Sequence, residues 1–292
     1  MDKERSYAFT PCEEGDLDKI EEALRRHSDS FAPPIEGVEE SQIVLKVLDP
    51  QGVIIAGCTA SVDSWGVLNV DDLWVSKRYR HKGIGSKLVE QIERIGRERG
   101  CYLSLLGTFD FQAPEFYEKL GYTLFNIWED YPIGHANYSF YKRLDQAAHE
   151  ESPLPYWIEV GEEEDGEFIS DQLAAYNASR VPIAHGRLPF DRKITDEEGN
   201  LVGGYAGGNS KRDAAMLDML WVDEAYRGQG IGTALLEAAE REAINLGAYV
   251  MFVGAFDWQV DFFRCRGYAV TGELQDCPKG HTYYSLEKRL ER

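Results

Sequence analysis

The feature that most constrains the fold of this chain is an internal repeat. Residues 71–88 read DDLWVSKRYRHKGIGSKL, residues 218–235 read DMLWVDEAYRGQGIGTAL, and ten of these 18 positions are identical. The same offset of 147 residues pairs GTFDFQ at 107–112 with GAFDWQ at 254–259. Collinear matches at so long a spacing are typical of a duplicated domain and not of a solenoid of short repeats. The chain is therefore predicted to contain two related domains.

The length of the chain and the position of the repeat indicate where the two domains meet. With 292 residues, the chain can hold two domains of roughly 100–150 residues each. Apolar periodicity stops in DQAAHEESPLP at 145–155, where two prolines lie close together. We predict an N-terminal domain over residues 1–147, a linker over 148–155 and a C-terminal domain over 156–292.

Within each copy, the pattern of apolar residues predicts alternating strands and helices. A helix is expected at Asp16–Arg26, and a hairpin at Ile43–Leu48 and Val53–Val62 around Asp-Pro-Gln-Gly. The first copy continues with a strand at Val70–Val75, a helix from Gly85 to Gly100, a strand at Tyr102–Phe109, a short helix at Pro114–Leu120 and two further strands. The second copy repeats this order with Leu217–Val222, Ile231–Leu246, Tyr249–Phe256 and Asp261–Arg266. We expect an α/β fold in which each copy has a mixed central sheet flanked by helices.

The net charge of the chain limits the kinds of molecule that it is expected to bind. The chain has 51 acidic and 31 basic residues, which gives a formal net charge of −20. This acidity argues against non-specific binding to nucleic acid or to an anionic membrane, because both require a basic surface. The acidity is compatible with a cationic partner. It is equally compatible with an acidic surface that only keeps the protein soluble. No stretch approaches the roughly 20 apolar residues of a membrane span.

The cysteines and the N-terminal residues bear on the compartment. Five cysteines are scattered without a Cys-x-x-Cys pair, so neither a disulfide framework nor a structural zinc site is expected. The first residues carry no signal-peptide pattern. We expect a cytoplasmic protein that holds no metal.

A glycine-rich turn occurs in both copies. It reads Arg80-x-x-Gly83-x-Gly85 in the first and Arg227-x-x-Gly230-x-Gly232 in the second, each between a predicted strand and a predicted helix. A helix N-terminus presents unpaired N–H groups and the positive end of a dipole, and glycines let the backbone approach a ligand. The turn therefore predicts a pyrophosphate cradle; a turn that only packs a strand closely on a helix is the alternative. Leu88 and Leu235 stand where a dinucleotide fingerprint needs its third glycine, and neither copy contains a P-loop.

Together with Val75 before the turn and Phe116-Tyr117-Glu118-Lys119-Leu120-Gly121-Tyr122 after the next strand, this pattern resembles the GNAT superfamily of acetyl-CoA-dependent N-acetyltransferases. The resemblance covers most of both copies. It implies that backbone amides of the turn hold the CoA pyrophosphate, and that the preceding strand edge pairs with the pantetheine arm where neighbouring strands splay. In the first copy the implied residues are Leu73, Trp74, Val75, Arg80, His81, Lys82, Gly83, Ile84, Gly85 and Ser86. In the second copy they are Leu220, Trp221, Val222, Arg227, Gly228, Gln229, Gly230, Ile231, Gly232 and Thr233.

The two copies differ in the residue that could protonate the leaving thiolate. Acetyl transfer requires that the amine loses a proton, that the thioester carbonyl is polarised and that the departing thiolate gains a proton. By the resemblance, a tyrosine on the short helix commonly serves the thiolate, and Tyr117 matches that position. Phe263 stands there in the second copy and has no proton to give. An aromatic residue that only fills the core is the alternative for Tyr117.

The base is expected on the strand before the turn, where the resemblance often places a carboxylate. Asp71 and Asp72 lie on this strand. By the two-residue period of a strand, Asp71 should share a face with Leu73, and Asp72 should point the other way. We favour Asp71, because Asp218 matches it in the second copy, and keep Asp72 in reserve, because Met219 replaces it. A strand-end aspartate that only faces water is the alternative.

These observations predict an N-acetyltransferase that moves an acetyl group from acetyl-CoA, its co-substrate, to a primary amine. The expected acceptor is a small cationic metabolite or an amino-bearing antibiotic. The first domain is expected to be catalytic, and the second to bind acetyl-CoA without turnover or to serve as a structural partner. A peptide or protein N-acetyltransferase and a non-catalytic acyl-CoA-binding sensor are the alternatives. We expect either a monomer that is an intrachain pseudo-dimer or a homodimer.

Overall fold

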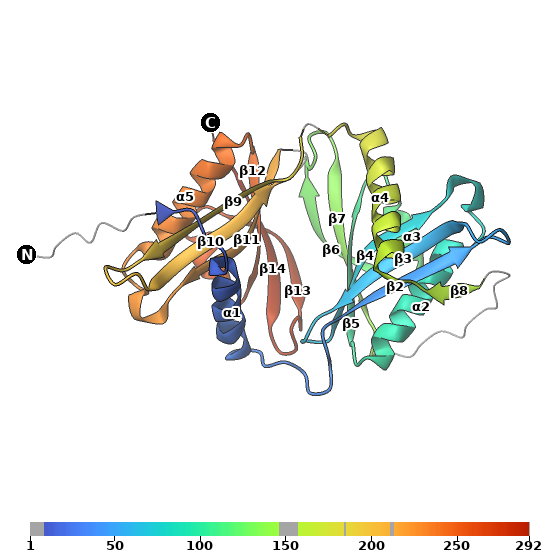
Figure 1. Cartoon of the computed structure of the whole chain (residues 1–292), viewed down its shortest axis with the longest axis horizontal. Helices are drawn as coiled ribbons and strands as arrows, with labels where there is room; N and C mark the ends of the chain where they lie inside the picture. The colour runs from blue at the N-terminus through green and yellow to red at the C-terminus, as the bar shows by residue number, and fades with distance from the viewer. Residues whose placement is uncertain (1–8, 146–156, 184, 211–212, 292) are drawn as a thin grey trace, which may run out of the picture.

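One sheet runs through both copies of the repeat (Figure 1). The computed structural model describes residues 9–145, 157–183, 185–210 and 213–291, and 14 strands in these ranges form the sheet. The strands of the first copy are β1 (Phe9–Thr10), β2 (Ser41–Leu48), β3 (Ile54–Val62), β4 (Val67–Val75), β5 (Leu103–Phe109), β6 (Thr123–Glu129) and β7 (Ala136–Arg143). Those of the second are β8 (Ile158–Val160), β9 (Leu188–Thr195), β10 (Leu201–Asn209), β11 (Ala214–Val222), β12 (Val250–Phe256), β13 (Ala269–Gln275) and β14 (Thr282–Arg289). Their order across the sheet is β1-β9-β10-β11-β12-β14-β13-β6-β7-β5-β4-β3-β2-β8.

Helices pack against this sheet in both copies. They are α1 (Asp16–Asp29), α2 (Ile84–Glu98), α3 (Pro114–Lys119), α4 (Glu163–Arg180), α5 (Ile231–Asn245) and α6 (Val260–Arg264), with short 3-10 turns η1 (Lys77–Tyr79) and η2 (Glu224–Tyr226). Helix α2 packs on β2, β3 and β4, and α5 packs on β9, β10 and β11. Strands β4 and β5 are parallel, as are β11 and β12, and the other described pairs are antiparallel. The predicted mixed α/β fold is confirmed, and β2 and β3 form the predicted hairpin.

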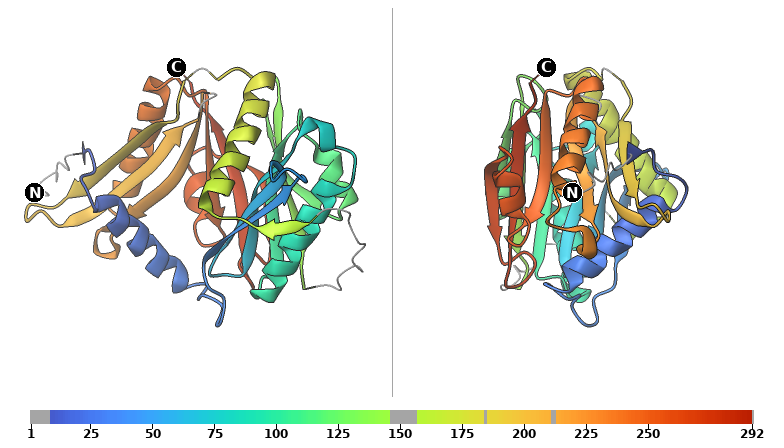
Figure 2. Two further views of the ribbon diagram at one scale, coloured as in Figure 1. Left: turned by 45° about the vertical axis from the view of Figure 1, so that its right-hand side comes forward. Right: turned by 90° about the vertical axis from the view of Figure 1, so that its left-hand side faces the viewer.

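The first strand and helix of each copy lie on the sheet of the other copy. Helix α1 packs on β10 and β11, and β1 pairs with β9. Helix α4 packs on β2, β3 and β4, and β8 pairs with β2. In Figure 1 the blue helix α1 therefore lies beside orange strands of the second copy, and the yellow helix α4 lies over blue strands of the first. The rotated views of Figure 2 show the same exchange, which the sequence repeat does not reveal.

Each exchanged helix is seated by an isoleucine that fills the space above a strand glycine. A Cβ atom at Gly57 of β3 would collide with Cδ1 of Ile169 in α4. At the equivalent position of the second copy, a Cβ atom at Gly204 would collide with Cδ1 of Ile20 in α1. Both isoleucines are fully buried. Cys58, the residue after Gly57, belongs to the core beneath α2, so α2 and α4 cover opposite faces of the first sheet.

An ion pair also anchors each exchanged helix. Lys46 Nζ of β2 lies 2.7 Å from Asp165 Oδ2 of α4. Its equivalent, Lys193 of β9, lies 2.6 Å from Asp16 Oδ2 of α1. Hydrogen bonding to Lys193 lowers the pKa of the Asp16 carboxyl, which is nearly buried. Because both lysines are largely shielded from solvent, each pair helps to fix the end of its helix on the other copy's sheet.

The two copies meet where β6 pairs with β13. Asn126 and Gly272 are equivalent residues of the repeat, and they face each other across this junction. A Cβ atom at Gly272 would lie 2.5 Å from Asn126 Cβ and 2.5 Å from Phe125 O, so only glycine allows the strands to approach here. The pairing of equivalent positions indicates a pseudo-two-fold axis that passes through this point.

Reciprocal hydrogen bonds on either side of the junction follow the same pseudo-symmetry. Tyr102 donates its hydroxyl hydrogen to Asp276 O at 3.0 Å, and the equivalent Tyr249 donates to Asp130 O at 2.7 Å. The copies thus meet through the same surface, as subunits of a symmetric dimer do. The predicted linker, 148–155, lies outside the described residues, and the division of the chain at this point stays a prediction, as does the oligomeric state.

Among the helices of the described ranges, none is long and apolar enough to cross a bilayer. In the same part of the chain, no three His, Cys, Asp or Glu side chains gather in a way that could hold a metal ion. The expected cytoplasmic location and the expected absence of a metal stay predictions.

Candidate active site

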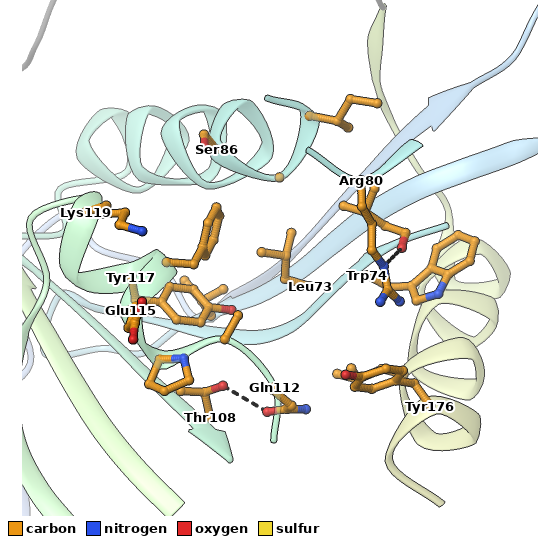
Figure 3. A pocket seen from close by; sticks show the side chains of 18 of the residues that line it. Leu73, Trp74, Arg80, Ser86, Thr108, Gln112, Glu115, Tyr117, Lys119 and Tyr176 are labelled. Carbon is orange, nitrogen blue, oxygen red and sulfur yellow. Dashed lines mark hydrogen bonds between the residues drawn. The ribbon is translucent and has the colours of Figure 1, made fainter. Parts of the chain in front are cut away.

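A cleft opens in the first copy where β4 and β5 separate. Residues 67–70 of β4 pair with residues 103–106 of β5, and beyond Val70 and Leu106 the two strands continue without pairing. The cleft between them has a volume of about 830 Å³ (Figure 3). In the second copy, β11 and β12 stop pairing after Leu217 and Val253, the equivalent positions. The strands therefore splay in both copies, as the sequence resemblance implies.

A β-bulge in β4 lies at the point where the strands separate. Thr59 of β3 pairs with Asp72, whereas the next residue, Ala60, pairs with Val70, so that Asp71 has no partner. An extra residue in one strand breaks the regular alternation of its side chains. The predicted pattern, with Asp71 and Asp72 on opposite faces, is therefore wrong.

Both aspartates turn toward the face that α4 covers. Asp72 accepts a hydrogen bond from Thr59 Oγ1 at 3.3 Å and another from Ser170 of α4. Asp71 accepts one from Ser61 Oγ at 3.5 Å. Thr59 and Ser61 are two residues apart on β3 and hence point to the same face. The bulge thus brings two carboxylates together beside the cleft.

The environment of this carboxylate pair favours the neutral form. Partial burial raises the pKa of both Asp71 and Asp72, and the negative charge of Asp72 raises the pKa of Asp71 further. Within the described residues, neither carboxylate forms an ion pair with a lysine, arginine or histidine of the chain. A carboxylate with a raised pKa is better suited to accept a proton near neutral pH than an ordinary aspartate.

In the second copy, an arginine of the chain neutralises the carboxylate that is equivalent to Asp71. Asp218, the counterpart of Asp71, forms an ion pair with Arg187. The Arg187 side chain lies over Gly208, where a Cβ atom would collide with its guanidinium group. Met219 replaces the second aspartate. The second copy therefore lacks the pair of unpaired carboxylates.

The glycine turn forms a cradle at the N-terminus of α2. Gly83 caps the helix with a φ of 79°, a left-handed conformation that favours glycine. The first backbone hydrogen bond of the helix runs from Lys87 N to Gly83 O, so the three N–H groups between these residues have no acceptor in the helix. Space is open above Gly83, because a Cβ atom there would meet nothing within 4 Å. Arg80 Nε donates to Val75 O at 2.9 Å, which fixes the guanidinium group at the rim of the cleft.

The second copy preserves this backbone and places a different cation, Arg266, beside it. Gly230 caps α5 with a φ of 84°, and Arg227 Nε donates to Val222 O at 3.0 Å. Arg266 Nη2 donates to Thr233 Oγ1 at 2.6 Å, next to the N-terminus of α5. The two turns thus have the same geometry, and both can hold an anionic group through backbone N–H groups.

Tyr117 extends from α3 into the cleft, toward Leu73 (Figure 3). Its ring packs against Phe116 and Tyr122, and burial raises the pKa of its hydroxyl. The hydroxyl therefore keeps its proton at neutral pH and can donate a hydrogen bond to a charged group. Phe263 occupies the same place in the second copy, with matching ring contacts to Phe262 and Tyr268.

The cleft collects most of the predicted site residues of the first copy, together with several that were not predicted. Predicted residues that line it are Asp71, Leu73, Trp74, Val75, Arg80, His81, Gly83, Ile84, Gly85, Ser86 and Tyr117. Asp72 lies beside the cleft, and Lys82 turns toward the ring of Tyr79. The residues that sequence reasoning missed include Thr108, Gln112, Glu115, Lys119, Leu173 and Tyr176. Leu173 and Tyr176 belong to α4, so the second copy contributes one wall of the cleft of the first.

Comparison with known proteins establishes the family. The sequence model of the acetyltransferase (GNAT) family matches this chain twice, at residues 8–122 and 123–268. The chain belongs to this family, and it is an acyltransferase.

Several relatives carry specific names. The blasticidin-S acetyltransferase of Streptomyces morookaense is 40% identical over 95 residues, which cover 32% of this chain and 69% of that protein. The glucosamine 6-phosphate N-acetyltransferase of Trypanosoma brucei brucei is 32% identical over 127 residues, which cover 38% of this chain and 84% of that protein. A crystal structure of an acetyltransferase from Bacillus cereus ATCC 14579 is 35% identical, covers 46% of this chain and 95% of its own, and gives a TM-score of 0.42.

The raised pKa of Asp72 predicts that this residue reduces stability at neutral pH. Above the raised pKa the partly buried carboxylate is charged at a cost, whereas below the ordinary aspartate pKa of about 3.9 it is neutral in both the folded and the unfolded chain. Asp72→Asn should therefore raise Tm at pH 8, and the gain should shrink as the pH is lowered to about 4, near the ordinary aspartate pKa. Thermal unfolding at both pH values measures it, with Asp171→Asn, an exposed position on α4, as the control. A gain that is equal at both pH values would contradict the account.

Proposed function

We propose that the first copy transfers an acetyl group from acetyl-CoA to a primary amine of a small cationic metabolite or an amino-bearing antibiotic. The observation that carries this proposal is one cleft that combines a helix N-terminal cradle, a buried tyrosine and the carboxylate of Asp71, with Asp72 beside it. Among the residues that the structure describes, no cation of the chain pairs with either carboxylate. Membership in the acetyltransferase family gives the reaction class. Acetyl-CoA, when bound, supplies an activated thioester.

The fit of the cleft to acetyl-CoA rests on three features of this chain. The cradle at Gly83 offers unpaired N–H groups and open space for a diphosphate, and Arg80 adds positive charge at its rim. The unpaired edge of β4 beyond Val70 offers backbone groups to an extended amide-containing arm. Tyr117 lies at the inner end of this path and would protonate the departing sulfur. Asp71 would accept the proton of the amine, directly or through water, with Asp72 in reserve.

The charges around Asp71 support a cationic acceptor. In the second copy, Arg187 occupies the space beside the equivalent carboxylate. The first copy has Glu40 at the position of Arg187, and Ser61 at the position of the glycine beneath it. In the second copy, an arginine of the chain fills this place. In the first copy, the same place can therefore hold a cation of the acceptor. The relatives named above act, by their names, on blasticidin-S and on glucosamine 6-phosphate.

We propose that the second copy binds acetyl-CoA without turnover. Its cradle matches that of the first, whereas Phe263 cannot donate a proton and Asp218 is neutralised by an arginine. A second catalytic centre is disfavoured on both counts. Turnover of a peptide amine, or CoA binding with no turnover of any amine, would favour the alternatives of a protein acetyltransferase or of a sensor.

A charge placed at either cradle tests acetyl-CoA binding. Gly83→Asp and Gly230→Asp each put a carboxylate where a diphosphate would lie, and the repulsion should weaken that site by about 100-fold. Calorimetric titration with acetyl-CoA should find two sites in the parent chain and one in each variant. Gly83→Asn is the matched control, because asparagine also tolerates a left-handed φ and carries no charge. A parent chain that binds no CoA species would contradict the proposed function.

The hydroxyl of Tyr117 tests which copy is catalytic. Tyr117→Phe removes one proton donor and keeps the ring, so that the fold and acetyl-CoA binding should persist. General acid catalysis contributes about 10²–10⁴ in rate, and kcat should fall by a factor in this range. Thiol release from acetyl-CoA, with an amine acceptor identified beforehand, measures kcat. Gly230→Asp should cost far less; if it abolishes turnover while Tyr117→Phe retains it, the roles of the two copies are reversed.

A further inference from the structure

The end of α4 connects the two strands that separate at the cleft. On the β4 side, the guanidinium carbon of Arg80, whose Nε is bonded to Val75 O, lies 5.0 Å from the ring centroid of Tyr176. On the β5 side, the Tyr176 hydroxyl donates to Phe111 O at 3.1 Å, in the loop between β5 and α3. Figure 3 shows Tyr176 reaching from α4 across the mouth of the cleft, below Arg80. One side chain thus contacts both walls.

A neighbouring residue of α4 strengthens the contact with the β5 wall. Gln112 Nε2 donates to Asn177 Oδ1 at 2.8 Å, and Gln112 Oε1 accepts from Thr108 Oγ1 at 2.9 Å. Arg180 also lies over the Tyr176 ring, at 5.2 Å from its centroid. The ring is therefore held by two guanidinium groups, its hydroxyl is bonded, and the loop that it contacts is tied to the same helix.

The second copy makes the equivalent contact with the loop through different residues. Phe31, just beyond α1, stacks on Trp258 with ring centroids 5.0 Å apart, and Trp258 is the counterpart of Phe111. Burial of His27 on α1, and to a lesser degree the charge of Arg227, lowers the pKa of its imidazole. In both copies, therefore, a residue at the end of the exchanged helix contacts the loop after the splayed strand. Because different residue types make this contact in the two copies, we infer that the cleft requires the contact itself and not one particular pair of residues.

We propose that Tyr176 is a positioning residue for the first cleft. Its ring holds the Arg80 guanidinium group against the diphosphate of the acyl donor, and its hydroxyl fixes the separation of the two strand ends between which the donor lies. The inference rests on the proposed binding of acetyl-CoA. It gives the second copy a function in the reaction of the first: a side chain that it supplies sets donor affinity.

Two substitutions separate the two contacts of Tyr176. Tyr176→Phe keeps the ring under Arg80 and loses the bond to Phe111 O, whereas Tyr176→Leu loses both. The Kd values are measured by titration of the full chain that also carries Gly230→Asp, so that only the first cleft binds the donor. Two donors are compared: acetyl-CoA, and S-acetyl-pantetheine, which has no diphosphate or nucleotide. Tyr176→Phe should raise Kd about two- to tenfold for both donors. Compared with Tyr176→Phe, Tyr176→Leu should raise the Kd for acetyl-CoA by a further factor of about three to ten and leave the Kd for S-acetyl-pantetheine unchanged.

The donor comparison distinguishes positioning from a merely structural role. Phe31→Leu, which removes the equivalent contact from the second copy, is the matched control and should leave the first cleft unchanged. Parental Kd values in Tyr176→Leu, or an equal loss for both donors together with a lowered Tm, would overturn the inference. A parent chain that binds acetyl-CoA without turning it over would contradict the proposed reaction only, since the Kd comparison still decides the role of Tyr176. A parent chain with no affinity for acetyl-CoA would overturn both.

Discussion

The seating of each exchanged helix on a glycine of the other copy is the contact on which the site depends. Ile169 fits above Gly57 only because that strand position has no side chain, and it holds α4 against the sheet whose strands splay. From this seat, Ser170 reaches Asp72 and Tyr176 reaches both walls of the cleft. Because close packing leaves little freedom for such a helix to shift, the position of the site follows from the position of the seat.

Features set by short stretches of sequence were predictable. The glycine turn, the strand before it and the helix after it follow from residues that are adjacent in the chain, and the repeat doubled the evidence for them. The left-handed φ of Gly83 is the conformation for which glycine is the favoured residue. Tyr117 and Phe263 could be aligned across a deletion of one residue because the aromatic pattern around them repeats, and their matching ring contacts confirm that alignment.

Features set by the choice between two similar partners were not predictable. The two sheets are copies, so either could accept an exchanged helix, and α4 has hardly any apolar periodicity, with Ile169 as its one buried residue. No predicted segment corresponds to α4, and Tyr176 was therefore missed. The bulge at Asp71 depends on pairing with β3, and strand alternation alone gave the wrong face. The sequence repeat shows that Arg187 stands at the position of Glu40. Only the structure shows that Arg187 pairs with Asp218, and this contact gives the replacement its significance.

The central claim is that a cation of the acceptor binds beside Asp71, at the place that Arg187 fills in the second copy. Transferring that arrangement tests it directly: Glu40→Arg with Ser61→Gly should give the first copy its own ion pair. Turnover of cationic amines, measured by thiol release, should then be lost, while acetyl-CoA binding stays at the parental level. Glu40→Gln with Ser61→Gly, which supplies the space without the cation, should remain active. Parental turnover of the same amines by the arginine variant would contradict the account.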